Sequence, residues 1–315
     1  MKVACKSIDR LVSVQSRPLG MPRDDLYELY KLLDADGPVS YQIANAFLAN
    51  PKCKVGIVTG ATDAVNFPNG ESDGPLGAAA LARALDRLGF DVTIYTESLA
   101  VMGVQEMEKI LKTDVPVVAF EGLDAREQFH EIAQKLDICL FTEKLGMNEK
   151  GVQHSVTGRA RTGNRAYVDW IAWEMNELGK TTIGIGDGGN EIGFGKVFMA
   201  ARKLILHGEE CVCGCGGGII TRTATTYLYP VSISNWGCYA LCAALAIAVK
   251  DPSLVVQPEE EDAMLRRCCE IELCDGGSGK PIYAIDGVSG EVSVGFVRML
   301  QEEVFVMMTE NNRAF

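Results

Sequence analysis

The sequence predicts a three-layer α/β fold, in which helices cover both faces of a mainly parallel β-sheet. Short apolar, β-branched runs alternate with helix-length amphipathic stretches along most of the 315 residues. Glycine or proline marks many of the boundaries between these segments. Of all residues, 47% are hydrophobic, which is enough to build a sizeable core. Strands that alternate with helices form parallel sheets, so we expect a Rossmann-like arrangement.

The predicted strands are short apolar runs that lead into polar loops. The run at 55–59 is the clearest, because buried parallel strands are continuous apolar segments. Parallel pairing places all carboxyl ends at one edge of the sheet, where ligands of such folds bind. The remaining strands are predicted over 91–96, 115–120, 138–142, 181–185 and 227–233.

The predicted helices are amphipathic or apolar stretches with recognisable ends. The helix at 75–88 has Pro75 in its first turn and Gly89 just past its end, where these residues favour helix boundaries. The stretch 237–249 is nearly all apolar and indicates a buried helix that is too short to span a bilayer. The other helices are predicted over 24–33, 41–49, 99–111, 125–136, 168–178, 191–206, 259–269 and 291–308, whereas 211–226 gives no clear pattern.

We expect a single domain over residues 1–315, with residues 1–50 as a helical accessory segment of it. The sequence contains neither a low-complexity linker nor an internal repeat. A polar, basic loop at 143–165 interrupts the alternation of strands and helices. Loops of this length inside compact domains are usually functional or disordered.

The charge and the cysteines limit the partners and the compartment. A formal net charge of −12 disfavours nucleic acid and anionic membranes, so we expect a small-molecule amino acid substrate and leave a homo-oligomer open. Eleven cysteines, an odd number spread along the chain, suit reduced thiols. The N-terminus lacks a secretory apolar region, which favours a cytoplasmic protein. Its early basic residues leave the mitochondrial matrix as the alternative.

The loop that follows the first predicted strand carries two acids. Glu71 and Asp73 are two residues apart, so they can converge on a substrate or a cation. The loop opens a helix, whose unpaired backbone N–H groups favour an anion, and its glycines allow close approach of a ligand. The alternative interpretation is that Ser72 or Asp73 only caps the helix. The expected substrate-binding residues of this loop are Thr59, Gly60, Gly74 and Gly77.

A second loop, at 185–195, contains five glycines together with Asp187, Asn190 and Glu191. Its spacing fits the dinucleotide-binding fingerprint poorly, because glutamate or asparagine falls where glycine is needed. The alternative is a tight turn with a helix cap. We expect substrate contacts from Gly188, Gly189 and Asn190.

Two further segments follow predicted strands. Ser234 and Asn235 can donate to a carboxylate or carbonyl, and Trp236 could form a pocket wall; a helix cap with a core tryptophan is nearly as good an interpretation. The basic loop supplies positive charge beside the expected site, although runs of charge are usually solvated surface. Its candidate residues are Lys144, Asn148, His154, Arg159, Arg161 and Arg165.

The cysteine-rich segment gives only a weak metal signal. Cys211, Cys213 and Cys215 form Cys-x-Cys-x-Cys, which does not match the usual zinc spacing. The chain has three histidines, which argues against a multi-histidine site. We therefore interpret most cysteines as packing residues.

The loops that follow the predicted strands together resemble those of the C-terminal domain family of D-glutamate cyclases. The order and spacing agree over roughly residues 8–300. The resemblance implies cyclisation of D-glutamate to 5-oxo-D-proline with loss of water, a carbon–oxygen lyase reaction. It rests on Asn69-Gly70-Glu71-Ser72-Asp73-Gly74-Pro75, Glu143-Lys144-x-Gly146, Gly186-Asp187-Gly188-Gly189-Asn190-Glu191-Ile192-Gly193 and Ser234-Asn235-Trp236-Gly237.

The implied reaction needs a base, an oxyanion partner and an acid. Asp73 or Asp187 could be the general base if burial raises its pKa. A helix N-terminus or Lys144 could stabilise the oxyanion. A protonated Glu71 or Glu191 could assist water loss, while Asn190 and Asn235 would orient the substrate.

Several carboxylates in one pocket would repel an anionic substrate, which a divalent cation would relieve. Oxygen ligands favour magnesium or manganese, and the sequence leaves open whether any metal binds. The candidate ligands are Glu71, Asp73, Asp187 and Glu191. Two other functions stay open: a phosphate- or nucleotide-binding enzyme that uses the same glycine loops, and a non-catalytic small-acid binding protein.

Overall fold

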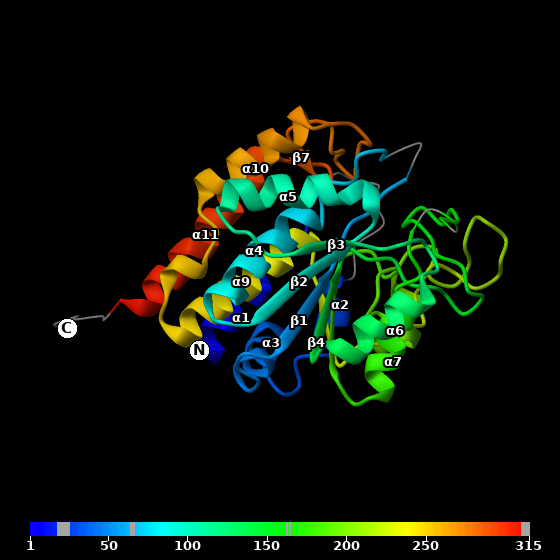
Figure 1. Ribbon diagram of the computed structural model, residues 1–315, viewed down its shortest axis with the longest axis horizontal. Helices are drawn as coiled ribbons and strands as arrows, with labels where there is room; N and C mark the ends of the chain where they lie inside the picture. Colours follow the sequence, from blue (N-terminus) through cyan, green and yellow to red (C-terminus); the bar gives the residue numbers. More distant parts are fainter. Residues whose placement is uncertain (18–25, 64–66, 162, 164, 310–315) are drawn as a thin grey trace.

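A computed structural model describes residues 1–17, 26–63, 67–161, 163 and 165–309 (Figure 1). Six parallel strands form its main sheet in the order β3-β2-β1-β4-β5-β6. The order reverses between β1 and β4, and sheets of this kind bind ligands beyond the strand ends at such a point. The strands are β1 Lys54–Val58, β2 Asp91–Thr96, β3 Val117–Ala119, β4 Ile138–Thr142, β5 Thr181–Gly186 and β6 Tyr227–Pro230.

The sheet is buried on both faces, which confirms the predicted three-layer α/β class. Along β4, Ile138 and Leu140 belong to the larger core, whereas Cys139 and Phe141 belong to the core on the opposite face. This alternation follows from the two-residue period of a strand. Because both cores are apolar, the strand is apolar throughout, as the sequence suggests.

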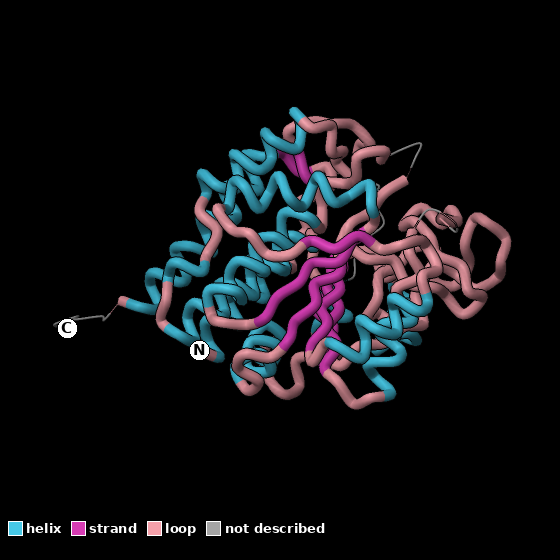
Figure 2. Tube along the Cα trace, in the orientation of Figure 1, coloured by secondary structure: helices cyan, strands magenta, loops and turns pink. Residues whose placement is uncertain are grey.

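Helices cover the two faces unequally (Figure 2). Two of them, α6 (Arg126–Lys135) and α7 (Asp169–Glu177), pack on one face. The other face carries the larger layer, in which α9 is buried over most of its length. That layer contains α1 Lys2–Val12, α3 Val39–Leu48, α4 Pro75–Arg87, α5 Val101–Leu111, α9 Ser234–Val249, α10 Pro258–Glu270 and α11 Gly290–Met308.

The first fifty residues contribute to the larger core. Helix α1, which the periodicity analysis did not predict, packs with α3 against α9. Asp9 on α1 is fully buried and accepts hydrogen bonds from the hydroxyls of Tyr30 (2.7 Å) and Tyr229 (2.6 Å). The predicted helix at 24–33 begins outside the described residues; its described part is α2, Leu26–Tyr30.

The predicted helix at 191–206 begins later than expected. A 3₁₀ turn at Gly195–Val197 leads into α8, Phe198–Leu204. The N–H groups of Gly193 (2.8 Å) and Gly195 (3.3 Å) donate to Thr223, so this backbone is bonded to a distant loop. The turn-rich segment near the C-terminus holds a small hairpin of β7 (Ala284–Ile285) and β8 (Val288–Ser289).

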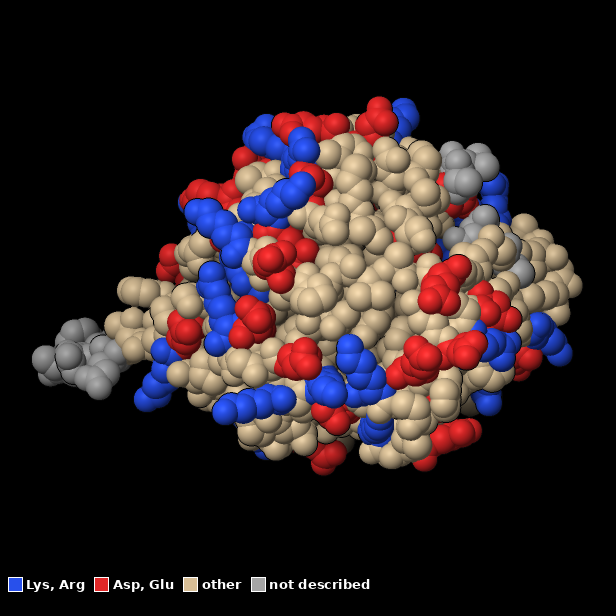
Figure 3. Space-filling model, in the orientation of Figure 1, with Lys and Arg blue, Asp and Glu red and all other residues tan. Residues whose placement is uncertain are grey.

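Two surface features bear on partners. Among the described residues, every helix falls short of the combined length and hydrophobicity that a bilayer-spanning segment needs. Acidic and basic side chains are interspersed over the face shown in Figure 3. On that face, the negative charge of the chain is therefore not concentrated in one patch.

Candidate active site

Three buried carboxylates meet beyond the carboxyl ends of the central strands. Asp73 precedes α4, Glu143 directly follows β4, and Asp187 directly follows β5. One carboxylate oxygen from each lies within 4.8 Å of the others. We call Asp73, Glu143 and Asp187 the acid cluster. Oxygen donors at this spacing suit a hard divalent cation.

Asp73 and Asn235 hold the acid cluster in place by capping each other's helices. Asp73 accepts the N–H groups of Ser234 (3.0 Å) and Asn235 (2.8 Å) at the start of α9. Asn235 Oδ1 accepts the N–H groups of Gly74 and Gly77, both at 2.8 Å, at the start of α4. Asp73 therefore does act as a cap, but for α9 rather than for the helix that follows it.

Glu71 and Asp286 extend the acidic region. Both are buried, and a Cβ added at Gly276 would overlap a carboxylate oxygen of each, so both lie against this glycine. Arg17 brings positive charge: its Nη2 donates to Asp286 Oδ2 at 2.6 Å and also bonds Asp187. A guanidinium between two carboxylates offsets part of their repulsion.

The acids raise one another's pKa values. Burial raises the pKa of Glu71 well above its ordinary value, and the charges of Glu143 and Asp286 add to this effect. Burial also raises the pKa of Asp73, with Asp286 and Glu143 as the next causes, against the opposing effect of the Asn235 N–H. Burial and mutual repulsion therefore both favour the protonated forms of Glu71 and Asp73.

A cavity of about 120 Å³ adjoins the acids. Its lining includes Glu71 from the loop after β1, Glu143 and Arg165 from the basic loop after β4, and Asn190 from the loop after β5. Arg165 is buried, and its Nε and Nη1 have no hydrogen-bond partner among the residues that the structure describes. Arg161 also lines the cavity and pairs with Asp63 at 2.9 Å. Such a cavity suits a small molecule that carries a carboxylate.

Lys144 is buried beside this site and directed toward Glu97. Its Nζ donates to the Gly60 carbonyl at 3.0 Å and pairs with the Glu97 carboxylate. Burial lowers the pKa of Lys144, and the charge of Glu97 opposes that shift. A buried ion pair with an additional carbonyl partner fixes the position of the loop after β4.

The glycine-rich loop after β5 is shaped by its own side chains. Glu191 Oε1 accepts the N–H of Gly188 at 2.9 Å, which closes the turn. Asn190 donates to the His154 carbonyl at 2.7 Å. Gly189 has a φ of 90°, a left-handed conformation that favours glycine. Asn190 is the predicted residue of this loop that lines the cavity.

The remaining predicted residues lie at four places. Ser234 donates to Glu143 Oε2 at 2.7 Å, beside the acid cluster. Trp236 stacks on Phe296 of α11 at 4.1 Å, within the helical layer. Thr59 is buried beside Gly74, whose φ of 103° would strain any larger residue. Asn148 donates to Cys215 Sγ at 3.3 Å and to the Gly218 carbonyl at 2.7 Å.

Sequence reasoning did not assign four of these charged residues to the site. Glu143 and Glu97 directly follow β4 and β2, a position at which the rule for parallel sheets could have found them. Asp286 lies in the turn of a two-residue hairpin and Arg17 follows α1. Neither has a sequence signal, because each reaches the site only through tertiary packing.

Comparison with known proteins places the chain in a family. The family described as "D-glutamate cyclase-like, C-terminal" matches residues 16–301. The chain belongs to this family. It is also 30% identical over 198 residues to a human protein named "D-glutamate cyclase, mitochondrial". That match covers 57% of this chain and 30% of the human protein, so the chain spans less than a third of its relative's length.

Proposed function

We propose that this chain is a D-glutamate cyclase-like lyase, which converts D-glutamate to 5-oxo-D-proline and water. Family membership supports cyclase-like chemistry in general. The observation that carries the specific proposal is the small cavity in which buried Arg165 lies beside the carboxyls of Glu71 and Glu143. An anion-binding group next to proton-exchanging groups is what this cyclisation requires.

The reaction balances without any external reagent. The α-nitrogen forms a bond to the carbon of the γ-carboxyl group, and one oxygen of that group leaves. The ammonium loses two protons, and both depart with that oxygen as water. The protein therefore has to move protons within the site rather than supply or remove them. Groups whose pKa values lie near the working pH do this best.

Arg165 and Asn190 are the proposed binding groups. The free Nε and Nη1 donors of Arg165 suit a substrate carboxylate, because hydrogen bonds between a guanidinium and a carboxylate are charge-assisted and strong. Asn190 is held by its bond to His154 and lines the same cavity. Holding amine and γ-carboxyl in contact accounts for part of the rate, because it removes the entropy cost of their encounter.

Glu71 and Glu143 are the proposed acid and base. Glu71 has a raised pKa and lines the cavity, so in its protonated form it can donate to the departing oxygen. Glu143 also lines the cavity, where it can accept a proton from the ammonium. Neither Asp73 nor Asp187 is among the lining residues, so we give the base role to Glu143 rather than to them.

The acid cluster is the proposed cation site. Asp73, Glu143 and Asp187 replace the sequence-derived set, which contained Glu71 and Glu191 in place of Glu143. Three carboxylates favour magnesium or manganese. Such an ion would polarise a carboxylate oxygen as a Lewis acid.

Incubation with D-glutamate, L-glutamate and 5-oxo-D-proline, followed by chiral analysis, tests the function. Formation of 5-oxo-D-proline from the D-enantiomer alone supports it. Binding without turnover would identify a non-catalytic small-acid binding protein instead. A nucleotide-binding enzyme would be stabilised by nucleotides, for which a cavity of about 120 Å³ is small. Chelation followed by readdition of magnesium or manganese tests the cation; full turnover without metal rejects it.

The compartment is a separate proposal. The name of the human relative assigns that protein to mitochondria. This supports the mitochondrial matrix, the alternative to the cytoplasm that the basic N-terminal residues left open. Fractionation of cells that express the tagged chain would decide between the two.

A further inference from the structure

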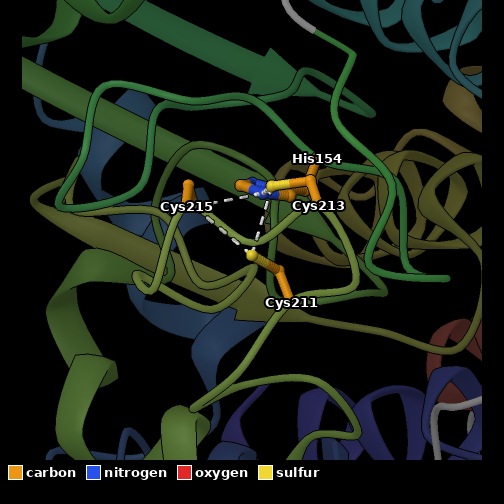
Figure 4. A group of neighbouring side chains, drawn as sticks. All are labelled: His154, Cys211, Cys213 and Cys215. Carbon is orange, nitrogen blue, oxygen red and sulfur yellow. Dashed lines mark hydrogen bonds between the residues drawn. The ribbon is translucent and has the colours of Figure 1, made fainter.

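Four metal-ligating side chains converge outside the acid cluster (Figure 4). His154 comes from the basic loop, and Cys211, Cys213 and Cys215 come from the segment that gave no clear secondary-structure pattern. Cys211 Sγ lies 3.2 Å from Cys213 Sγ and 3.3 Å from Cys215 Sγ. His154 Nε2 lies 3.1 Å from Cys213 Sγ and 3.7 Å from Cys215 Sγ.

These spacings match the edges of a small tetrahedron. All four ligand atoms lie within 4.8 Å of one another. Zinc binds thiolate sulfur at about 2.3 Å and imidazole nitrogen at about 2.0 Å, so ligand atoms around it are separated by about 3.5–3.8 Å. The observed distances need only a few tenths of an ångström of expansion to accept the ion.

The orientation of His154 supports a ligand role. Its Nδ1 lies 3.1 Å from the Val152 carbonyl oxygen, which can only accept, so Nδ1 carries the proton. In the neutral ring, Nε2 then presents its lone pair to the sulfurs. Metal-bound histidines are usually fixed in this way by a bond from their other nitrogen. Asn148 adds an N–H donor to Cys215 Sγ.

The local chain explains how the three cysteines reach one point. Gly214 and Gly216 have φ values of 79° and 75°, which turn the chain sharply on both sides of Cys215. Residues 205–223 contain neither helix nor strand. The N–H of Val212 donates to the Gly158 carbonyl at 3.0 Å and ties this segment to the basic loop. Such irregular loops gain much from a metal cross-link.

We propose that His154, Cys211, Cys213 and Cys215 bind one structural zinc ion that joins the basic loop to residues 205–223. Three cysteines and one histidine form a standard closed zinc site, and their soft donors distinguish it from the all-oxygen acid cluster. The sequence interpretation of these cysteines as packing residues missed the site, because its fourth ligand lies 57 positions before Cys211 in the chain.

The zinc site would also fix one wall of the cavity. Ser155, Val156 and Thr157 directly follow His154, and all three line the cavity. The His154 carbonyl accepts the hydrogen bond from Asn190, another lining residue. The zinc site itself does not depend on the proposed reaction, because its ligands are separate from the acid cluster.

Metal analysis of the full chain, purified under reducing conditions without chelator, tests the proposal. We expect one zinc per chain, and loss of that zinc in Cys213→Ser/Cys215→Ser. The matched control is Cys269→Ser, which removes a partly exposed cysteine outside the cluster and should retain zinc. Asp187→Asn should also retain zinc, which excludes the acid cluster as its site.

Cobalt replacement of zinc provides a second measurement on the unmodified sequence. The wild-type chain should take up one Co²⁺ with the visible and charge-transfer absorption of tetrahedral thiolate coordination. Wild-type protein with neither stoichiometric zinc nor this cobalt spectrum would overturn the proposal, as would full zinc retention in the double-serine variant. A Cys211–Cys213 disulfide in the native chain, detected as a loss of two hydrogens by mass spectrometry, would also overturn it.

Discussion

Asp73 accepts the backbone N–H of Asn235 at 2.8 Å, while Asn235 accepts the N–H groups of Gly74 and Gly77. Asp73 thus caps N–H groups at the start of α9, and Asn235 caps N–H groups at the start of α4. The two residues are 162 positions apart, so their bonds join the loop after β1 to the first turn of α9. The acid cluster is held rigidly because one of its members is part of this double cap.

Asp73→Asn tests the two roles of Asp73, as a cap of α9 and as a charged member of the acid cluster. The amide would place an N–H donor against a backbone N–H, so we expect a loss of about 1–3 kcal/mol in the free energy of unfolding. Loss of the charge should also lower kcat/KM for D-glutamate by about 10²-fold. Denaturant unfolding and steady-state kinetics measure the two effects. Asp86→Asn, at an exposed position of α4, is the control and should change neither.

A double-mutant cycle tests the buried pair of Lys144 and Glu97. Lys144→Met leaves a buried carboxylate without its ammonium, so we expect a loss of about 3–5 kcal/mol in the free energy of unfolding. The double variant Lys144→Met/Glu97→Gln should lose about 1–3 kcal/mol less than the sum of the losses in the two single variants. The exposed pair of Lys31 and Glu28 is the comparison, with changes below about 1 kcal/mol. Strict additivity at Lys144 and Glu97 would show that the pair is not coupled.

Gly276→Ala tests the contact that positions Glu71 and Asp286. The new methyl would overlap an oxygen of each carboxylate, so we expect both acids to move and the chain to lose about 1–3 kcal/mol of stability. Turnover of D-glutamate should fall with it. Gly122→Ala meets no atom within 4 Å and is the matched control. If the two variants behave alike in unfolding and turnover, Gly276 has no such role.

The pH dependence of stability tests the raised pKa of Glu71. Its folded-state pKa lies above the ordinary value of 4.5, so the native state binds the proton more tightly than the unfolded state. The resulting stabilisation is fully present below that value and is lost as the pH rises through the folded pKa. Glu71→Gln should therefore lose less stability than wild type as the pH rises above the ordinary value of 4.5.

Denaturant unfolding at several pH values, in chelator-containing buffer, gives the slope of the free energy of unfolding against pH for each chain. The stability of the variant should still depend on pH, because other buried acids remain and Asp73 also has a raised pKa. Identical slopes for wild type and Glu71→Gln would show that Glu71 is already ionised in the folded chain.

Local patterns predicted the fold well, because strands buried on both faces must be apolar. The strand at 138–142 agrees with β4 residue by residue. The helix predicted at 191–206 failed at its start, where Glu191 bonds to its own turn and Gly193 and Gly195 donate to Thr223. Hydrophobic periodicity cannot reveal either kind of bond, and the bonds of the two glycines also depend on a distant loop.

The site was predictable only where it lies at strand ends. The spacing rule for parallel sheets led to Asp187 and to the loop that holds Asp73. Asp286 and the partners of His154 could not be found in this way, because they lie in irregular segments that only the tertiary structure brings close. A sequence pattern reports neighbours along one element, whereas these contacts join separate loops.

Cyclisation of D-glutamate labelled with ¹⁸O at both γ-carboxylate oxygens tests the central claim most directly. We expect wild type to form 5-oxo-D-proline that retains one label and to release the other in water. Glu71→Gln should form it about 10²-fold more slowly. No labelled lactam above the heat-inactivated control, with or without added magnesium or manganese, would contradict the account, as would equal rates in wild type and variant.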